Sequence, residues 1–127
     1  MAIRTELSLR LPNSPGALSG VCRVLADERV NIQSLAVEAN GQLRLIVDNP
    51  IHAAASLRDR HHQVTERDVI VLLIPNNPGS LAPALRLIAD AGVNLEYVYG
   101  GAAESAASAA IVLGVQDAQR AAAAAGV

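Results

Sequence analysis

Two short segments of this chain have the residue types needed to bind a small charged molecule. Asn13 and Asn76 each begin the pattern Asn-x-Pro-Gly, which ends at Gly16 in the first segment and at Gly79 in the second. An Asn side chain carries an acceptor oxygen and two donor hydrogens, so it can bind an ammonium group or a carboxylate. Glycine has no side chain and lets a ligand approach the backbone closely. These residues indicate non-covalent recognition of a free amino acid.

A further asparagine follows each segment. Asn31 follows Asn13 by 18 positions, and Asn94 follows Asn76 by the same number. We expect the two asparagines of each copy to flank the loop and to recognise the ammonium and the carboxylate together. Alternatively, they brace the turns in which they lie, through hydrogen bonds to the backbone. The candidate ligand-binding residues are Asn13, Gly16, Asn31, Asn76, Asn77, Gly79 and Asn94.

The repeated segments belong to an internal duplication with an offset of 63 positions. Val30 recurs as Val93, at the offset that separates Asn13 from Asn76. This period is longer than the roughly 20 to 50 residues of common solenoid repeats, so each copy should be a small domain of its own. The predicted domains are residues 1–65 and 66–127.

The hydrophobic patterns predict the elements of the first copy. From Ile3 to Leu11, apolar residues alternate with polar ones, which predicts a strand with one buried face and one solvent-facing side that carries Glu6 and Ser8. Asn40-Gly41 is typical of the tight type I′ turn of a β-hairpin. We expect strands at 3–11, 32–37, 43–47 and 63–65, and helices after Gly16 and from Pro50 to about Arg60.

This order, βαββαβ, predicts an α+β ferredoxin-like fold in each unit. Right-handed crossovers then give a four-stranded antiparallel sheet with both helices on one face. In the second copy we expect strands at 69–74, 95–99 and 107–113 and helices at 79–91 and 117–125. No residues remain for a fourth strand. We therefore expect the last strand of the second unit to be missing and its open edge to be covered by something else.

Particular residues mark the expected ends of the helices. Ser14 before Pro15 is typical of an N-cap followed by proline at the first helical position. Gly92 suits the left-handed residue that ends a helix, whereas the first copy has Arg29 at the corresponding position. We expect the first helix to end with more strain or in a different turn.

The order of these motifs resembles the ACT domain, a small ligand-binding module. In each half a hydrophobic strand leads into Asn-x-Pro-Gly-x-Leu, and Val-Asn-Ile at 30–32 or Val-Asn-Leu at 93–95 opens a second strand. The resemblance covers nearly the whole chain, once in each half. It implies the ferredoxin-like fold and an amino acid held between the strand-to-helix loop of one unit and elements of its neighbour.

Two functions follow as alternatives. The first is a regulatory, allosteric sensor that binds a free amino acid at ACT-domain interfaces and modulates a partner enzyme or assembly. The second is a ligand-free structural or oligomerisation subunit of an amino-acid-metabolism enzyme. Saturable binding of a free amino acid separates the two.

The composition excludes several other classes. Of the 127 residues, 51% are hydrophobic and 17% are charged, which indicates a folded globular chain. A net charge of −2 and an aromatic content of 2% argue against nucleic-acid binding. The apolar runs are far shorter than the roughly 20 residues that span a membrane. Cys22 is the single cysteine, and no basic-then-apolar leader begins the sequence, so we expect a cytoplasmic protein.

No residue pattern indicates catalysis, a cofactor or a metal. Cys22 lies on the apolar stripe of its helix and is interpreted as structural. His61 and His62 are adjacent, but no Cys, Asp or Glu stands at metal-ligand spacing around them. Arg58 and Arg60 alternate with acidic residues, which is typical of a solvated face. We predict that the protein is not an enzyme and uses no cofactor.

A homodimer is predicted from the first strand of the second copy. Glu6 and Ser8 correspond to Val69 and Val71 after the offset, and Leu73 lies two positions further on. A strand that is apolar on both sides is typical of burial on both faces. Because the helices cover only one face of the sheet, we expect the other face to pack against a second chain.

Overall fold

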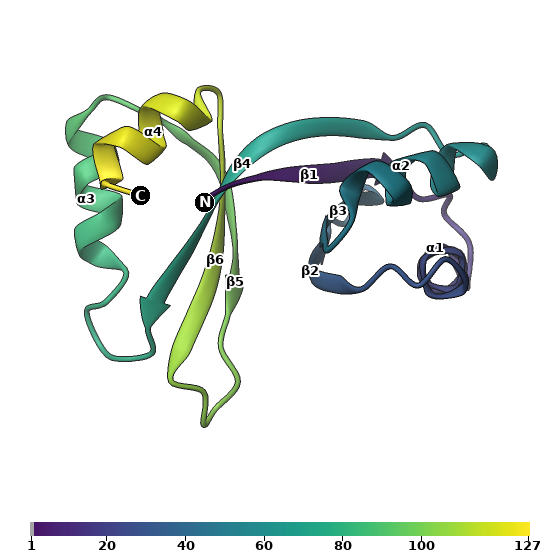
Figure 1. Cartoon of the computed structure of the whole chain (residues 1–127), viewed down its shortest axis with the longest axis horizontal. Coiled ribbons are helices and arrows are strands. Elements are labelled where there is room, and N and C mark those ends of the chain that lie inside the picture. Colours follow the sequence, from purple (N-terminus) through teal and green to yellow (C-terminus); the bar gives the residue numbers. More distant parts are fainter. Residues whose placement is uncertain (1) are drawn as a thin grey trace. The chain divides into compact units, whose positions relative to one another are not determined.

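The computed structural model describes residues 2–127, which form two compact units. The first unit is Thr5–Arg67, and the second consists of Asp68–Val127 together with residues 2–4. Figure 1 shows the elements, which in chain order are β1 (Ile3–Arg10), α1 (Ala17–Asp27), β2 (Ile32–Val37), β3 (Gln42–Val47), α2 (Pro50–Asp59), β4 (Thr65–Pro75), α3 (Ala82–Asp90), β5 (Leu95–Gly101), β6 (Ser108–Val115) and α4 (Ala118–Ala125).

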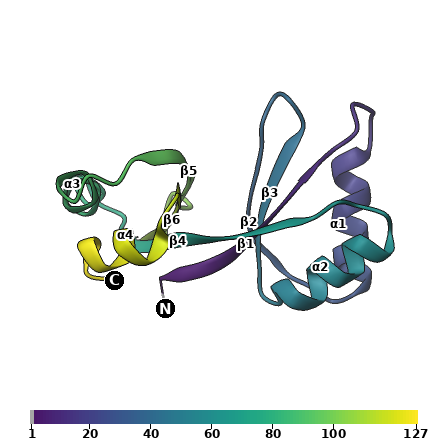
Figure 2. The ribbon, with the colours of Figure 1, turned by 90° about the horizontal axis from the view of Figure 1, so that it is seen from above.

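The first unit has the predicted ferredoxin-like arrangement, with hydrogen-bonded strands in the order β2-β3-β1-β4. β3 runs antiparallel to both of its neighbours, with Leu45 opposite Leu7 of β1 and Leu35 of β2. Alternation along β1 places Leu7 in the core, where it clusters with Leu25 of α1 and Leu57 of α2. These two helices lie side by side (Figure 2). The predicted α+β fold is confirmed.

The second unit repeats this architecture with the strand order β5-β6-β4. β6 runs antiparallel to both neighbours, with Leu113 opposite Ile70 of β4 and Val98 of β5. Ile88 of α3 and Ala121 of α4 are fully buried in the same core cluster. The second copy therefore builds three strands of its own, as predicted.

The remaining edge of β4 in the second unit is occupied by the start of the chain. The Val71 amide donates a hydrogen bond to the Ala2 carbonyl oxygen at 2.7 Å, and Ile3 packs against the second core. An open strand edge presents unpaired N–H and C=O groups that readily bind another strand. The predicted gap in the second sheet is thus filled by residues 2–4.

β4 is one continuous strand of 11 residues, whereas the sequence predicts separate strands at 63–65 and 69–74. The two predicted strands merge because neither Gly nor Pro lies between Thr65 and Ile74 to interrupt the extended backbone. The two units divide within this strand, between Arg67 and Asp68, instead of after residue 65.

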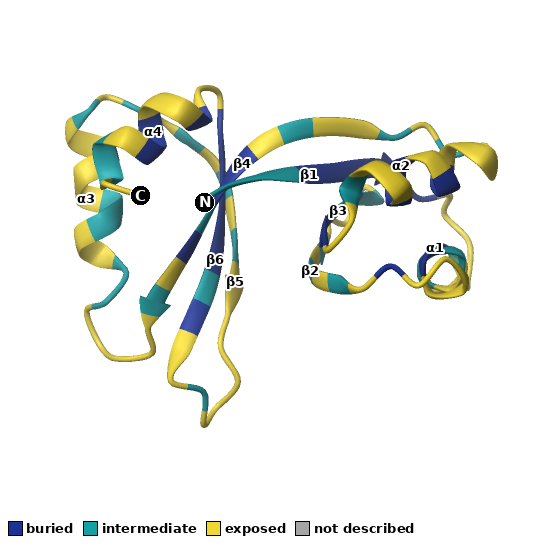
Figure 3. Ribbon diagram, viewed as in Figure 1, coloured by how far each residue is buried: buried dark blue, intermediate teal, exposed yellow. Residues whose placement is uncertain are grey.

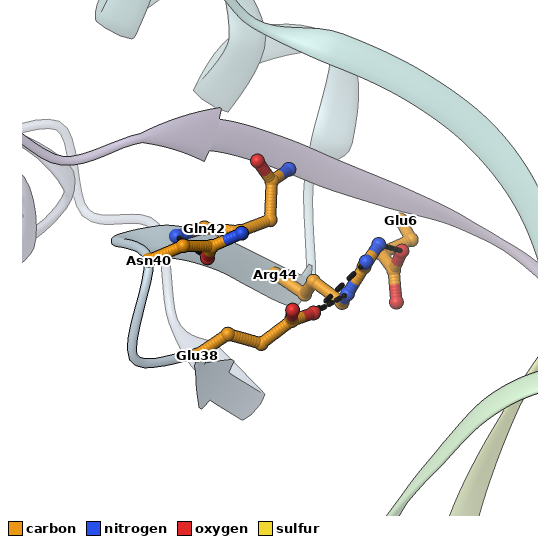
Figure 4. Close-up of polar contacts among 5 residues, drawn as sticks. All are labelled: Glu6, Glu38, Asn40, Gln42 and Arg44. Carbon is orange, nitrogen blue, oxygen red and sulfur yellow. Dashed lines mark hydrogen bonds and ion pairs between the residues drawn. The ribbon is translucent and has the colours of Figure 1, made fainter.

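The polar side of β1 is not solvent-facing along its length, and that prediction is wrong. Figure 3 shows burial along β1, where Glu6 is 0% exposed and Ser8 7%. Burying a carboxylate requires a compensating partner. Arg44 of β3 supplies one, with Nη1 3.6 Å from Glu6 Oε1, and it also donates to Glu38 Oε1 from Nη2 at 3.0 Å (Figure 4). Glu6, Arg44 and Glu38 form a charged cluster in the first unit.

Candidate functional site

The first Asn-x-Pro-Gly loop borders a pocket of about 550 Å³ at the end of β1. The pocket is lined by residues 11–14, 16–19 and 37–41, so the loop before α1 and the β2–β3 hairpin enclose it. Gly16 has φ 81, and apart from its chain neighbours no atom lies within 4 Å of the position that a Cβ would take. Glycine adopts this left-handed conformation at no steric cost, and the space beside it stays open to a ligand.

The loop leaves several hydrogen-bonding groups free at this pocket. The Ala17 amide donates to the Ser14 carbonyl at 3.3 Å, and the Gly20 amide donates to the Gly16 carbonyl at 2.9 Å. Between them, the amides of Leu18 and Ser19 belong to the first helical turn, where N–H groups have no intrahelical acceptor. Both residues line the pocket.

Asn13 is exposed beside these amides, and its side chain has no hydrogen-bond partner in residues 2–127. The predicted N-cap role of Ser14 is wrong. α1 begins at Ala17 with Gly16 in the capping position and without a side-chain cap, because the left-handed Gly16 turns the chain into the helix only after Pro15. Ser14 contributes its carbonyl oxygen instead. The pocket therefore offers free donors from the backbone together with an unengaged amide side chain.

The second loop has the same backbone conformation as the first, but fewer of its hydrogen-bonding groups are free to bind a ligand. Gly79 has φ 80 with open space around it, and residues 74–77 and 79–82 line a pocket of about 430 Å³. The Asn76 side chain donates to the Ala106 carbonyl at 3.0 Å, so it braces the loop between β5 and β6. Pro83 in the first turn of α3 has no N–H to offer a ligand.

Asn77 lines this second pocket, and no side-chain hydrogen bond ties it to the described part of the chain. It takes the place that Ser14 has in the first loop. The second loop therefore keeps one unengaged asparagine, but this residue is one position further along the loop than Asn13.

Asn31 lies at the far end of the first sheet from its loop. Its amide donates to Asp48 Oδ1 at 2.9 Å, and the Asp48 amide donates back to the Asn31 carbonyl at 3.1 Å. β2 then runs from this end to the pocket, which begins at Val37. At about 3.3 Å per residue, the strand from Ile32 to Val37 spans about 16 Å. The structure does not bring Asn31 together with Asn13 inside one unit, because the helix returns the chain to the opposite end of the sheet.

Asn94 is separated from its loop in the same way. It lies at the start of β5, next to the pair Leu95 and Val115, whereas the Asn76 amide binds the Ala107 carbonyl beside the other end of β6. Asn94 borders a separate pocket of about 220 Å³ together with Gln116, Asp117 and Arg120. The predicted pairs of asparagines thus do not flank one loop in either unit.

A further pocket of the first unit contains residues that the sequence pattern assigned to a solvated face. It has a volume of about 560 Å³ and is lined by Arg10 at the end of β1 and by Arg60, His61 and His62 after α2. The sequence contains one signal for this pocket. The two copies differ near the end of their first strand, where the second copy has Leu73 at the position that corresponds to Arg10.

Two absences hold for residues 2–127. No three His, Cys, Asp or Glu side chains are grouped so that they could hold a metal ion. None of the helices combines the length and the apolar character that crossing a membrane requires.

Comparison with known proteins identifies a family and similar solved structures. A family model described as an ACT domain pair matches residues 1–123. The structure is similar to the crystal structure of a protein from Bacteroides thetaiotaomicron, with 33% identity, coverage of 97% of this chain and 86% of that chain, and a TM-score of 0.89. A search of curated proteins finds no significant match.

Two other solved structures are regulatory subunits of aspartate kinase. The ligand-free subunit from Thermus thermophilus has 19% identity, covers 99% of this chain and 91% of its own, and gives a TM-score of 0.71. The subunit from Thermus flavus has 17% identity, covers 99% of this chain and 95% of its own, and gives a TM-score of 0.65. At 19% and 17% sequence identity, the similarity shows only that these two subunits and this chain have the same fold.

Proposed function

The chain belongs to the ACT domain pair family, and we propose that it is a regulatory sensor that binds a free amino acid and passes the bound state to a partner enzyme or assembly. The observation that carries the proposal is the first loop pocket. There the unengaged Asn13 side chain lies beside the free amides of Leu18 and Ser19 and the open backbone of Gly16. Its volume of about 550 Å³ is in the usual range for small-molecule sites.

The groups around this pocket match the two charges of an amino acid. Free N–H groups at a helix start favour a carboxylate, because the helix dipole adds to their hydrogen bonds. The Asn13 side-chain oxygen can accept from the ammonium group. Glu38 lines the same pocket and supplies a negative charge for that group, while its Oε1 also accepts from Arg44. In this arrangement the carboxylate binds at α1 and the ammonium between Asn13 and the hairpin.

The remaining elements of the proposal concern assembly. Asn31 and Asn94 lie far from the loop of their own unit, so a site that includes them needs a second ACT unit. In this proposal a second chain supplies it, at an interface in a homodimer. The partner enzyme is proposed to act in amino-acid metabolism, since two proteins of the same fold are regulatory subunits of aspartate kinase. In this proposal the chain itself is cytoplasmic, catalyses no reaction and uses no cofactor.

Titration calorimetry on the whole chain tests the site. A thermal-shift screen of the common amino acids identifies the ligand, since about 100 times its Kd adds about 2.7 kcal/mol of stability. Asn13→Ala should then weaken binding about tenfold to a hundredfold, because losing a hydrogen bond to a charged group costs about 1.5–3 kcal/mol. Asn76→Ala is the matched control, and its affinity at the first loop should stay unchanged because that side chain is already held by Ala106.

Further variants separate the possible outcomes. Asn31→Ala and Asn94→Ala should weaken binding only if the ligand lies between two ACT units. If these units belong to different chains, the measured affinity should also depend on the protein concentration. Unchanged affinity in Asn13→Ala would contradict the proposed site. If no common amino acid binds the unmodified chain, the second candidate is favoured, a ligand-free structural or oligomerisation subunit. That candidate is supported by the exposed Leu73, which is 76% accessible on β4.

A further inference from the structure

The first unit contains a second pocket, called here the basic pocket, whose ionisable lining residues are Arg10, Arg60, His61 and His62. No Asp or Glu lines it, although the chain as a whole carries a net charge of −2. A local excess of basic groups on an acidic protein attracts anions to that place. We propose that the basic pocket binds a small phosphate-bearing anion. This inference is independent of the proposed amino-acid site.

Arg10 is held in place without being neutralised. Its Nε and Nη2 donate to the Asn40 carbonyl oxygen at 3.3 and 3.0 Å. A carbonyl fixes the plane of the guanidinium but carries no net charge, so the full positive charge of Arg10 stays available. The N–H groups that do not face Asn40 are left for a ligand in the basic pocket.

The other basic side chains of the pocket are also unengaged. Within residues 2–127, the side chains of Arg60, His61 and His62 form no hydrogen bond or ion pair. The basic side chains nearby do have acidic partners, since Arg58 is 3.1 Å from Glu66 and His52 is 3.4 Å from Glu28. The basic side chains next to the pocket are thus paired with acidic residues, whereas those that line it are not.

The left-handed backbone conformation of His61 supports a functional role for its side chain. His61 follows the end of α2 with φ 69, a left-handed conformation that disfavours residues with a Cβ. In the second unit the left-handed residue after α4 is Gly126 with φ 74. Strained non-glycine residues persist where the structure keeps them for another reason, often at functional sites.

The fold does not need these basic residues. The second unit builds the same arrangement of strands and helices with Leu73 in place of Arg10 and with Gly126 at the helix end. The basic residues of the pocket are therefore a feature of the first unit alone. The difference between the units thus points to a ligand that only the first unit binds.

The number of donor groups favours phosphate over a single carboxylate. A guanidinium group binds phosphate oxygens with two parallel hydrogen bonds, and two such groups together with two imidazoles match an anion with several acceptor oxygens. A volume of about 560 Å³ accommodates the phosphate together with a small organic group. Both inorganic phosphate and a phosphate monoester share this chemistry.

The test is an NMR titration of the whole chain with inorganic phosphate, glycerol phosphate and succinate, with KCl at matched ionic strength as the control for screening. Saturable shifts of the His61 and His62 ring signals by the phosphates are expected. Arg10→Gln and Arg60→Gln should each weaken the response about tenfold or more. Arg86→Gln is the matched control, because Arg86 is exposed on α3 and pairs with Asp90 at 3.2 Å.

The three probes distinguish the sources of the anion. Stronger binding of glycerol phosphate than of phosphate assigns the pocket to an organic phosphate, and equal binding assigns it to phosphate itself. Succinate that binds as well as either phosphate would overturn the proposal in favour of a dicarboxylate. The proposal also fails if the histidine signals of the unmodified chain respond no more to phosphate than to KCl. That readout does not depend on any variant folding.

Discussion

At the scale of single residues, identical side chains have different roles because their surroundings differ. Asn13 faces a pocket without a partner, while Asn76, its repeat equivalent, is tied to Ala106. The Glu6 carboxylate is fully buried, and Arg44 of the charged cluster is one of its partners. Removing one member of a buried ion pair costs more than the pair contributes, because the remaining charge is left in a poorly solvated place.

Arg44→Met should therefore destabilise the protein strongly. Loss of one partner of a buried pair costs about 3–5 kcal/mol, and we expect about 3 kcal/mol because the Arg44 side chain is 17% exposed. Adding Glu6→Gln to Arg44→Met should recover part of this loss. Arg86→Met is the control, since its exposed pair with Asp90 contributes less than about 1 kcal/mol. Urea unfolding measures the four proteins, and equal losses for Arg44→Met and Arg86→Met would contradict the role of the cluster.

At the scale of elements, the two copies end their first helices in the same turn with different residues. Arg29 has φ 58 after α1, and Gly92 has φ 74 after α3. The expectation that the first helix ends with more strain is therefore confirmed, and the alternative of a different turn is wrong. An L-residue in the left-handed region costs roughly 1–2 kcal/mol, of which the greater flexibility of unfolded glycine offsets a part.

Exchanging residue types at these two positions should have opposite effects. Arg29→Gly should stabilise the protein by about 0.5–1 kcal/mol by relieving the left-handed arginine. Gly92→Ala should destabilise it by about 1 kcal/mol, because alanine brings the same strain to the second unit. Thermal unfolding of each variant measures the shift. A loss of stability in Arg29→Gly would show that contacts of the arginine side chain outweigh the backbone strain.

The sequence predicts the elements well where local patterns decide them. The strand predicted from the alternation in β1 is observed, although its polar side is buried, and the hairpin turn at Asn40-Gly41 is observed, although only Gly41 has a positive φ and the predicted type I′ turn is therefore wrong. α3 begins at Ala82, three positions after the predicted Gly79, because Pro83 is best tolerated in the first turn. The merging of the two predicted strands into β4 is hidden in the hydrophobic pattern, because the charged residues 66–68 separate the two predicted runs although no Gly or Pro interrupts the backbone.

At the scale of the whole molecule, some features of the candidate site could be predicted from the sequence, and those that depend on contacts between distant residues could not. The glycines of both loops are predictable because a tight turn into a helix requires them. The separation of Asn31 from Asn13 depends on topology, and the engagement of Asn76 depends on a carbonyl 30 residues away. The basic pocket depends on which residues the end of β1 and the end of α2 bring together.

The proposed homodimer rests on the apolar residues of β4. Val69 is already buried within one chain, so Leu73, 76% exposed, is the principal residue left to contact a partner. In a two-fold dimer each substitution acts twice. Leu73→Lys should cost about 1.5–3 kcal/mol per chain and convert dimers to monomers. Leu87→Lys on α3, where Leu87 is 48% exposed, is the control.

Light scattering with size-exclusion chromatography reports the mass of each variant. A dimer in the unmodified chain and in Leu87→Lys, with a monomer in Leu73→Lys, is the expected result. A dimer that persists in Leu73→Lys would place the interface elsewhere. A monomer in the unmodified chain would refute the dimer itself.

The first residues of the chain complete the second unit, and this makes the order of the two units interchangeable. Since residues 2–4 complete the second unit and Thr65–Arg67 complete the first, each unit takes its final strand from the residues that lead into the other. If the two termini were joined and the chain were opened near Gln63, the permuted protein would have the same sequence of strands and helices as the original. The topology therefore does not distinguish a first half from a second. Only the side chains do, and these place the pocket beside Asn13 and the basic pocket in one half of an otherwise interchangeable pair.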